Sequence, residues 1–200
     1  MGGMTALPPL APRPEVLDFL STRRSRPAKT LRAPGPDRAA LEPLLRLALR
    51  APDHGKLEPW RLMVLEAPAR ARLAALSERM GRARGLDPDK VGKARAMFDQ
   101  APAMVAVVVA PVASDKIPEV EQALSAGAVC QTLLTAALAA GWGANWLSGW
   151  MAHDRDWGAE GLGLGPGEWV AGLIVIGTEG PVPPDRPRPD LAAKVAWVEA

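Results

Sequence analysis

The 200-residue sequence has few of the side chains that build disulfides and metal sites, with one cysteine, two histidines and no tyrosine. Because Cys130 is alone, an intrachain disulfide and a zinc site built from several cysteines are both excluded. No uninterrupted apolar run reaches the roughly 20 residues of a membrane span, so we expect no contact with a membrane. The N-terminus also lacks the cationic segment and apolar core of a signal peptide. These absences favour a protein of the reducing cytoplasm.

Neither sign of charge is in large excess. The chain has 24 Lys and Arg against 22 Asp and Glu, a formal net charge of +2. A dedicated nucleic-acid binder has a stronger and more clustered basic excess, so we expect no nucleic-acid partner. Hydrophobic residues (48%) and charged residues (23%) lie in the range of globular proteins, which predicts a single domain over residues 14–200. Residues 1–13 are rich in proline and have no hydrophobic period, which is typical of a flexible leader.

Hydrophobic periodicity and helix breakers predict an α+β fold with a central sheet. Asp37 is the expected N-cap of the second helix, and Gly141 is the expected cap at the end of the longest one. The predicted helices cover residues 14–22, 37–50, 68–80, 87–99 and 119–140. The predicted strands cover residues 60–66, 103–110 and 169–177, and residues 144–148 are expected to be a short strand or a loop.

The longest predicted helix is apolar on nearly all sides from Ala126 to Ala140. A helix of this kind lies at the centre of a domain or in an interface, because in a monomer much of it would be exposed to water. The pattern therefore predicts a subunit interface along this helix. Cys130 lies on the same helix and is expected to be a small core residue.

Two patterns are weak indications of function. The glycine-rich run 161–167 lacks the spacing of a nucleotide-binding loop, so it is interpreted as a turn-rich loop. His54 and His153 each stand beside an aspartate, but they lack the helical spacing of paired metal ligands. We therefore expect no metal site.

Three segments have residues that could bind a ligand. Arg23-Arg24-Ser25 follows the first helix, and two guanidinium groups with a hydroxyl can bind a phosphate, although a solvated basic turn has the same pattern. Residues 50–60 (RAPDHGKLEPW) form a polar connection between a helix and a strand. Residues 141–149 (GWGANWLSG) are small enough to let the backbone approach a flat ligand. An ordinary loop and a tight turn are the alternatives for the last two.

Taken in order, these segments resemble the nitroreductase family of flavoproteins. One subgroup has an early R-R-S, then R-A-P-D-H before P-W, then E-x-x-x-S-A-G on a long helix, and then G-x-G-x-x-W. The matching residues here are 23–25, 50–60, 121–127 and 141–146, and the resemblance spans about residues 15–180. It implies an FMN-dependent homodimer. Its nitroreductase-like fold would be a three-layer α/β/α sandwich with a central mixed sheet and a long apolar central helix.

The resemblance also implies roles for individual residues. It places FMN against eight residues of one chain: Arg23, Arg24, Ser25, Trp146, Leu147, Ser148, Arg186 and Arg188. It places Arg50 and His54 against the flavin of the partner subunit. It places the nicotinamide dinucleotide against Ala136, Ala137, Leu138, Ala139, Ala140 and Gly141.

The implied activity is that of an FMN-dependent NAD(P)H oxidoreductase. Hydride would pass from NADH or NADPH through the flavin to a nitroaromatic, a quinone or a similar small molecule, by a ping-pong mechanism and without a catalytic side chain. Lys56 and Glu58 depart from the Asn and Gln of many relatives, which leaves the flavin potential and the acceptor open. The alternatives are a flavin store or sensor without turnover, and a relative that reduces enones, dehalogenates or fragments its flavin.

Overall fold

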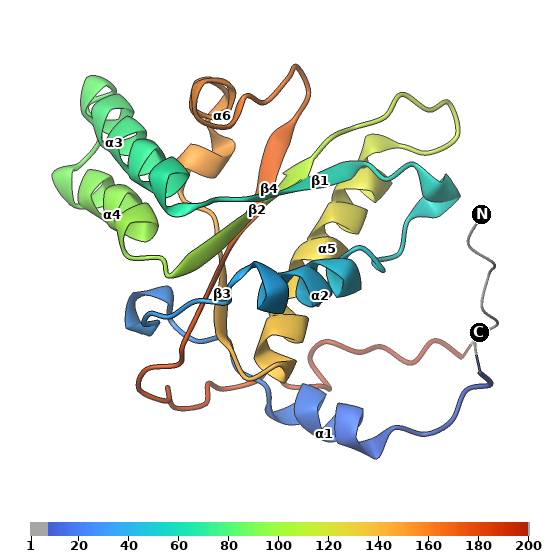
Figure 1. Cartoon of the computed structure of the whole chain (residues 1–200). Helices are drawn as coiled ribbons and strands as arrows, with labels where there is room; N and C mark the ends of the chain where they lie inside the picture. The colour runs from blue at the N-terminus through green and yellow to red at the C-terminus, as the bar shows by residue number, and fades with distance from the viewer. Residues whose placement is uncertain (1–7, 200) are drawn as a thin grey trace.

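The computed structural model describes residues 8–199 and is built around a four-stranded sheet of order β1-β2-β4-β3 (Figure 1). All neighbouring strands are antiparallel, so the expected mixed sheet is wrong for the part of the chain that the structure describes. The central strands read as continuous apolar runs, as parallel strands do, because helices cover both faces of the sheet. The strands are β1 (Trp60–Val64), β2 (Ala103–Val109), β3 (Gly143–Leu147) and β4 (Trp169–Gly177).

The five predicted helices are present, and the structure adds a sixth. Asp37 caps α2 as expected, since its carboxylate accepts a hydrogen bond from the amide of Ala40 at 2.8 Å. The additional helix, α6, begins after Asp154, whose carboxylate accepts from the amide of Trp157 at 2.8 Å. The helices are α1 (Pro14–Thr22), α2 (Arg38–Ala48), α3 (Ala67–Ala83), α4 (Pro88–Asp99), α5 (Glu119–Ala139) and α6 (Arg155–Leu162). Short 3₁₀ turns are η1 (Ala28–Thr30), η2 (His54–Lys56) and η3 (Trp150–His153).

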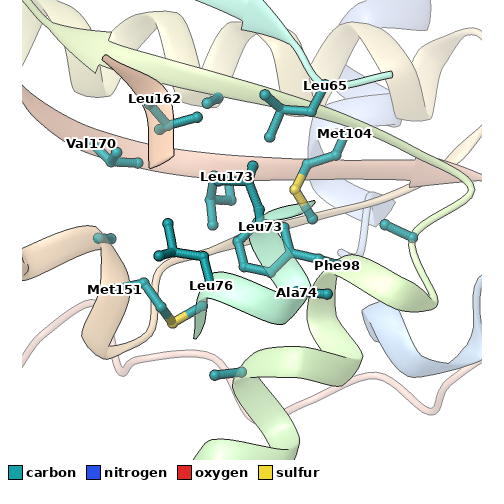
Figure 2. Close-up of a cluster of buried hydrophobic side chains, with 14 of the residues drawn as sticks. Leu65, Leu73, Ala74, Leu76, Phe98, Met104, Met151, Leu162, Val170 and Leu173 are labelled. Carbon is teal, nitrogen blue, oxygen red and sulfur yellow. The ribbon is translucent and has the colours of Figure 1, made fainter. Parts of the chain in front are cut away.

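The alternating side chains of the sheet divide the core into two clusters. On one face α2 and α5 pack against Val105, Val107, Ile174 and Ile176. On the other face α3, α4, η3 and α6 pack against Met104, Ala106, Leu173 and Val175 (Figure 2). Burial of one such aliphatic side chain contributes about 1.5–3 kcal/mol, so the two clusters hold the helices on the sheet.

Among the described residues, α5 is the one helix long and apolar enough to cross a membrane by length and composition. It packs instead on α2 and on strands β2, β3 and β4, which explains its apolar character. Its outer side is not covered within the chain, because Leu124 keeps 69% of its surface and Val120 is also exposed. The burial on all sides that the sequence predicts is therefore not met within one chain.

The described segments near both ends of the chain, α1 and the residues after β4, are largely exposed. α1 has no buried residue, although Val16, Leu17 and Leu20 give it an apolar face. After Thr178 the chain forms no further helix or strand and runs past α1 (Figure 1). Of the predicted leader, residues 1–7 lie outside the described residues, and residues 8–13 are exposed and irregular.

Candidate functional site

A cavity of about 430 Å³ opens where the turn after α1, the end of β3 and the chain beyond β4 meet. All eight residues that were predicted to hold FMN within one chain line this cavity: Arg23, Arg24, Ser25, Trp146, Leu147, Ser148, Arg186 and Arg188. The structure thus brings together three segments that are far apart in the sequence. We call Arg23, Arg24, Arg186 and Arg188 the arginine cradle.

Main-chain hydrogen bonds place the first segment beside β3. The amide of Arg23 donates to the carbonyl of Phe19 at 2.8 Å, which closes α1. The amide of Arg26 then donates to the carbonyl of Ala144 at 2.9 Å. Beyond β3, Gly149 adopts a φ of 94°, a conformation that favours glycine, and this turn ends the strand at the cavity. The local backbone therefore fixes two walls of the cavity. The cationic wall has Arg23 and Arg24, and the flat wall consists of Trp146, Leu147 and Ser148.

The arginine cradle concentrates positive charge with unsatisfied donors. Burial lowers the pKa of the Arg23 guanidinium, and the nearby charges of Arg188 and Arg24 lower it further. The buried Nε atoms of Arg23 and Arg24 have no hydrogen-bond partner among the described residues. A carboxylate at the edge, Asp185, accepts from the Arg186 amide at 2.8 Å and from the Arg188 guanidinium at 2.7 Å.

This donor set fits a phosphate monoester. Leaving a charged donor buried and unbonded is costly, and a dianion with three terminal oxygens would satisfy several guanidinium groups at once. The neighbouring wall of Trp146, Leu147 and Ser148 supplies an apolar ring and a strand end. The cavity therefore combines a cationic wall suited to an anion with a surface suited to a flat ring system.

Arg50 and His54 lie outside this cavity, in the connection between α2 and β1. Two residues of α5 anchor that connection. His54 Nδ1 lies 2.8 Å from Glu121 Oε2. Ser125 accepts from the Trp60 indole at 2.9 Å and donates to the carbonyl of Pro52 at 2.6 Å. The E-x-x-x-S-A-G segment thus holds residues 50–60, which we call the polar loop. Its sequence pattern alone does not reveal this role.

The six residues predicted to meet the nicotinamide dinucleotide form the last turn of α5 and the residues after it. The structure does not bring them to the arginine cradle, and none of them lines the 430 Å³ cavity. Ala137 is fully buried in the core. Ala139, Ala140 and Gly141 are exposed. Their predicted role stays a prediction.

Comparison with known proteins identifies the family. The model of the nitroreductase family matches residues 20–178. The chain belongs to the nitroreductase family. Over 164 residues it is 34% identical to YdjA of Escherichia coli (strain K12), which is named as an NAD(P)H nitroreductase, with 82% of this chain and 88% of YdjA covered.

Solved structures of the nitroreductase type have the same fold. A nitroreductase-like protein of Bacillus cereus superposes with a TM-score of 0.74 at 22% identity, with 99% of this chain and 100% of the other covered. A nitroreductase-type protein of Desulfovibrio desulfuricans, solved in complex with FMN, gives a TM-score of 0.70 at 23% identity, with coverage of 94% and 99%. At this identity the likeness shows the fold alone.

The nitroreductase-family cavity also has lining residues that the sequence reading missed: Gln131, Leu134, Pro187 and Pro189. Gln131 had a detectable signal, because it has the one amide side chain between Ala126 and Ala140, the apolar part of α5. The prolines gave none, since a Pro-rich tail resembles any irregular segment.

The two residues that depart from the nitroreductase pattern have an unusual backbone. Lys56 and Glu58 adopt positive φ angles of 54° and 48°. Asparagine tolerates this left-handed region better than lysine or glutamate. The carboxylate of Asp53 holds the turn, accepting from the amides of Leu57 at 3.2 Å and Glu58 at 2.8 Å. The polar loop is therefore strained and held from within.

Proposed function

We propose that this nitroreductase-family chain is an FMN-dependent NAD(P)H oxidoreductase with a nitroaromatic, a quinone or a similar small molecule as acceptor. The observation that carries the proposal is the arginine cradle, with the unbonded Nε atoms of Arg23 and Arg24, beside the flat wall at the end of β3. The name of YdjA supports NAD(P)H as reductant. The FMN complex of the Desulfovibrio relative supports the cofactor.

In this proposal the residues of the chain bind and orient FMN and the substrates. FMN, when bound, supplies the hydride chemistry that side chains do not have. Arg23 and Arg24 would neutralise the phosphate together with Arg186 and Arg188, and their guanidinium groups would donate hydrogen bonds to its oxygens. Trp146, Leu147 and Ser148 form the wall that excludes water from one side of the ring. The proposed ping-pong scheme has reductant and acceptor use the open side in turn.

The proposal includes a homodimer of three-layer α/β/α domains. α1 has nine residues and buries none of them, whereas isolated helices shorter than about 12–15 residues are marginal in water. Three large apolar side chains are also exposed within the chain: Leu17 (67%) on α1, Leu124 on α5 and Trp197 (86%) in the segment after β4. A second copy would bury these surfaces and bring Arg50 and His54 to the partner's cavity. Sedimentation equilibrium tests it, and a flavin-loaded monomer would contradict it.

An absorbance spectrum of the purified protein tests the proposed activity. We expect two flavin bands, and we expect anaerobic NADPH or NADH to bleach both. Bands that persist with either reductant would indicate a flavin store or sensor and refute turnover. A protein without flavin after incubation with FMN would refute the whole proposal.

The substitution Arg24→Ala tests the phosphate site. Loss of one charge-assisted contact of about 1.5–3 kcal/mol raises the dissociation constant of FMN about 10- to 100-fold. The matched control is Arg46→Ala, which removes an exposed arginine of α2 that pairs with Glu42. The control is expected to leave FMN affinity unchanged, and both variants should keep the wild-type melting temperature within a few degrees. Equal FMN affinity in the two variants would refute the assignment.

A further inference from the structure

Arg26 lies next to the arginine cradle without lining its cavity. Both its main-chain groups and its guanidinium are bonded. Its amide donates to Ala144, and its carbonyl accepts from the Asn145 side chain at 2.7 Å. Its guanidinium donates to the carbonyl of Arg24 at 2.6 Å and to the carboxylate of Glu179.

These bonds connect the two walls of the cavity. Arg24 and Ser25 belong to the turn after α1, and Asn145 belongs to β3 just before the lining residue Trp146. Glu179 follows β4 at the start of the segment that leads to Arg186 and Arg188. The Arg26–Glu179 ion pair is partly buried, with side-chain exposures of 23% and 35%. It therefore links the N-terminal half of the arginine cradle to the base of the C-terminal half.

We propose that Arg26 and Glu179 are positioning residues that fix the arginine cradle in the geometry that receives a phosphate monoester. The inference rests on the proposed FMN site. Four guanidinium groups that share one cavity repel one another, so an empty cradle tends to open. A framework that holds them in place lowers the ordering cost of binding. Arg26 does this through Arg24, and Glu179 does it through Arg26.

The direction in which removal of the Glu179 charge changes FMN affinity tests the inference. If Glu179 acted only through space, its negative charge would repel a phosphate, and its removal would tighten FMN binding. If Glu179 acts by positioning Arg26, its removal weakens FMN binding. Riboflavin, which has the same ring and no phosphate, separates a loss at the cradle from a loss of the whole cavity.

The experiment titrates the full-length, flavin-free protein with FMN and with riboflavin and follows flavin fluorescence. The variants are Glu179→Gln, Asn145→Ala and Arg26→Lys, and the matched control is Glu160→Gln. Glu160 pairs with Arg79 on the surface between α3 and α6, so the control removes the same charge from an ion pair elsewhere.

We expect two variants to raise the FMN dissociation constant about 5- to 10-fold: Glu179→Gln, which removes the charge from the bond to the Arg26 guanidinium, and Asn145→Ala, which removes the neutral hydrogen bond to the Arg26 carbonyl. Riboflavin affinity should change less than twofold in each. Arg26→Lys keeps the positive charge and one donor nitrogen, so it should lose less FMN affinity than Glu179→Gln. The ³¹P resonance of FMN should shift and broaden in Glu179→Gln but not in the control.

The outcomes separate the inference from the function it rests on. A wild-type protein that binds riboflavin as tightly as FMN would refute the phosphate site itself. A wild-type preference for FMN that Glu179→Gln leaves unchanged or increases would overturn the positioning role alone. Equal losses for FMN and riboflavin would also overturn it, because they would reflect general unfolding. If Glu179→Gln does not fold, Asn145→Ala decides the question by the same criteria.

Discussion

Gly172 of β4 lies directly beneath the indole of Trp146, which forms part of the cavity wall. A methyl group at position 172 would lie 2.6 Å from Cδ1 and 3.0 Å from Cε2 of that ring. Carbon atoms need about 3.5–4.0 Å, so the substitution Gly172→Ala must move the ring. Movement also breaks the hydrogen bond that the Trp146 indole donates to the carbonyl of Ala171 at 3.2 Å.

The expected loss follows from these two terms. Overpacking a well-packed core costs typically about 1–3 kcal/mol, and a neutral hydrogen bond contributes about 1 kcal/mol. We therefore expect the free energy of unfolding to fall by about 2–4 kcal/mol. The displaced ring also reshapes the wall of the cavity, so we expect FMN affinity to fall by about tenfold, which corresponds to 1.4 kcal/mol.

Urea denaturation followed by tryptophan fluorescence measures the first effect, and FMN titration measures the second. The matched control is Gly92→Ala on α4, where an added methyl group meets nothing within 4 Å. Alanine is a better helix former than glycine, so the control should gain about 0.5–1 kcal/mol. An unchanged unfolding midpoint in Gly172→Ala, or changes of the same sign in both variants, would refute the reasoning.

Two further predictions concern titratable groups. The bidentate bond from Arg61, at 2.7 and 2.9 Å, and then the bond from the Gly165 amide at 2.8 Å lower the pKa of Glu168 from 4.5 to about 2. The ion pair therefore stabilises the fold above pH 4.5, by about 1–2 kcal/mol after solvent screening, and this contribution is lost as the pH falls toward 2. In urea titrations between pH 2 and 6, Glu168→Gln should lose this part of the pH dependence, and an identical profile would contradict the assignment. Burial raises the pKa of Cys130 to about 12, so a thiol reagent at pH 8 should react only after unfolding, and a fast reaction with the native protein would contradict this.

The elements of the fold were predictable because they depend on local patterns. The β-branched run 103–109 and the helix cap at Asp37 are short-range signals, and the structure confirms both. The antiparallel order was not predictable, because strand direction depends on how the connections cross the sheet. α6 was missed because its eight residues include two glycines and their apolar period is too short to detect.

The cavity was predictable only through the ordered motifs. Arg23 and Arg186 are separated by most of the chain, and neither segment alone differs from a solvated basic turn. The contact between His54 and Glu121 and the place of Arg26 could not be read from spacing, because they depend on the tertiary packing of α5 and β3. The residues that line the cavity are therefore easier to predict from the sequence than the contacts that hold those residues in place.

The cavity joins the turn at residues 23–25 to the segment 186–189, with almost the entire domain between them. Such a site cannot exist on a nascent chain until synthesis has passed residue 188. Any earlier stage has only the half of the arginine cradle that Arg23 and Arg24 supply. Acquisition of the proposed FMN is then expected to be a late event that follows formation of the sheet. It would serve as a checkpoint that only a chain synthesised past residue 189 and folded can pass.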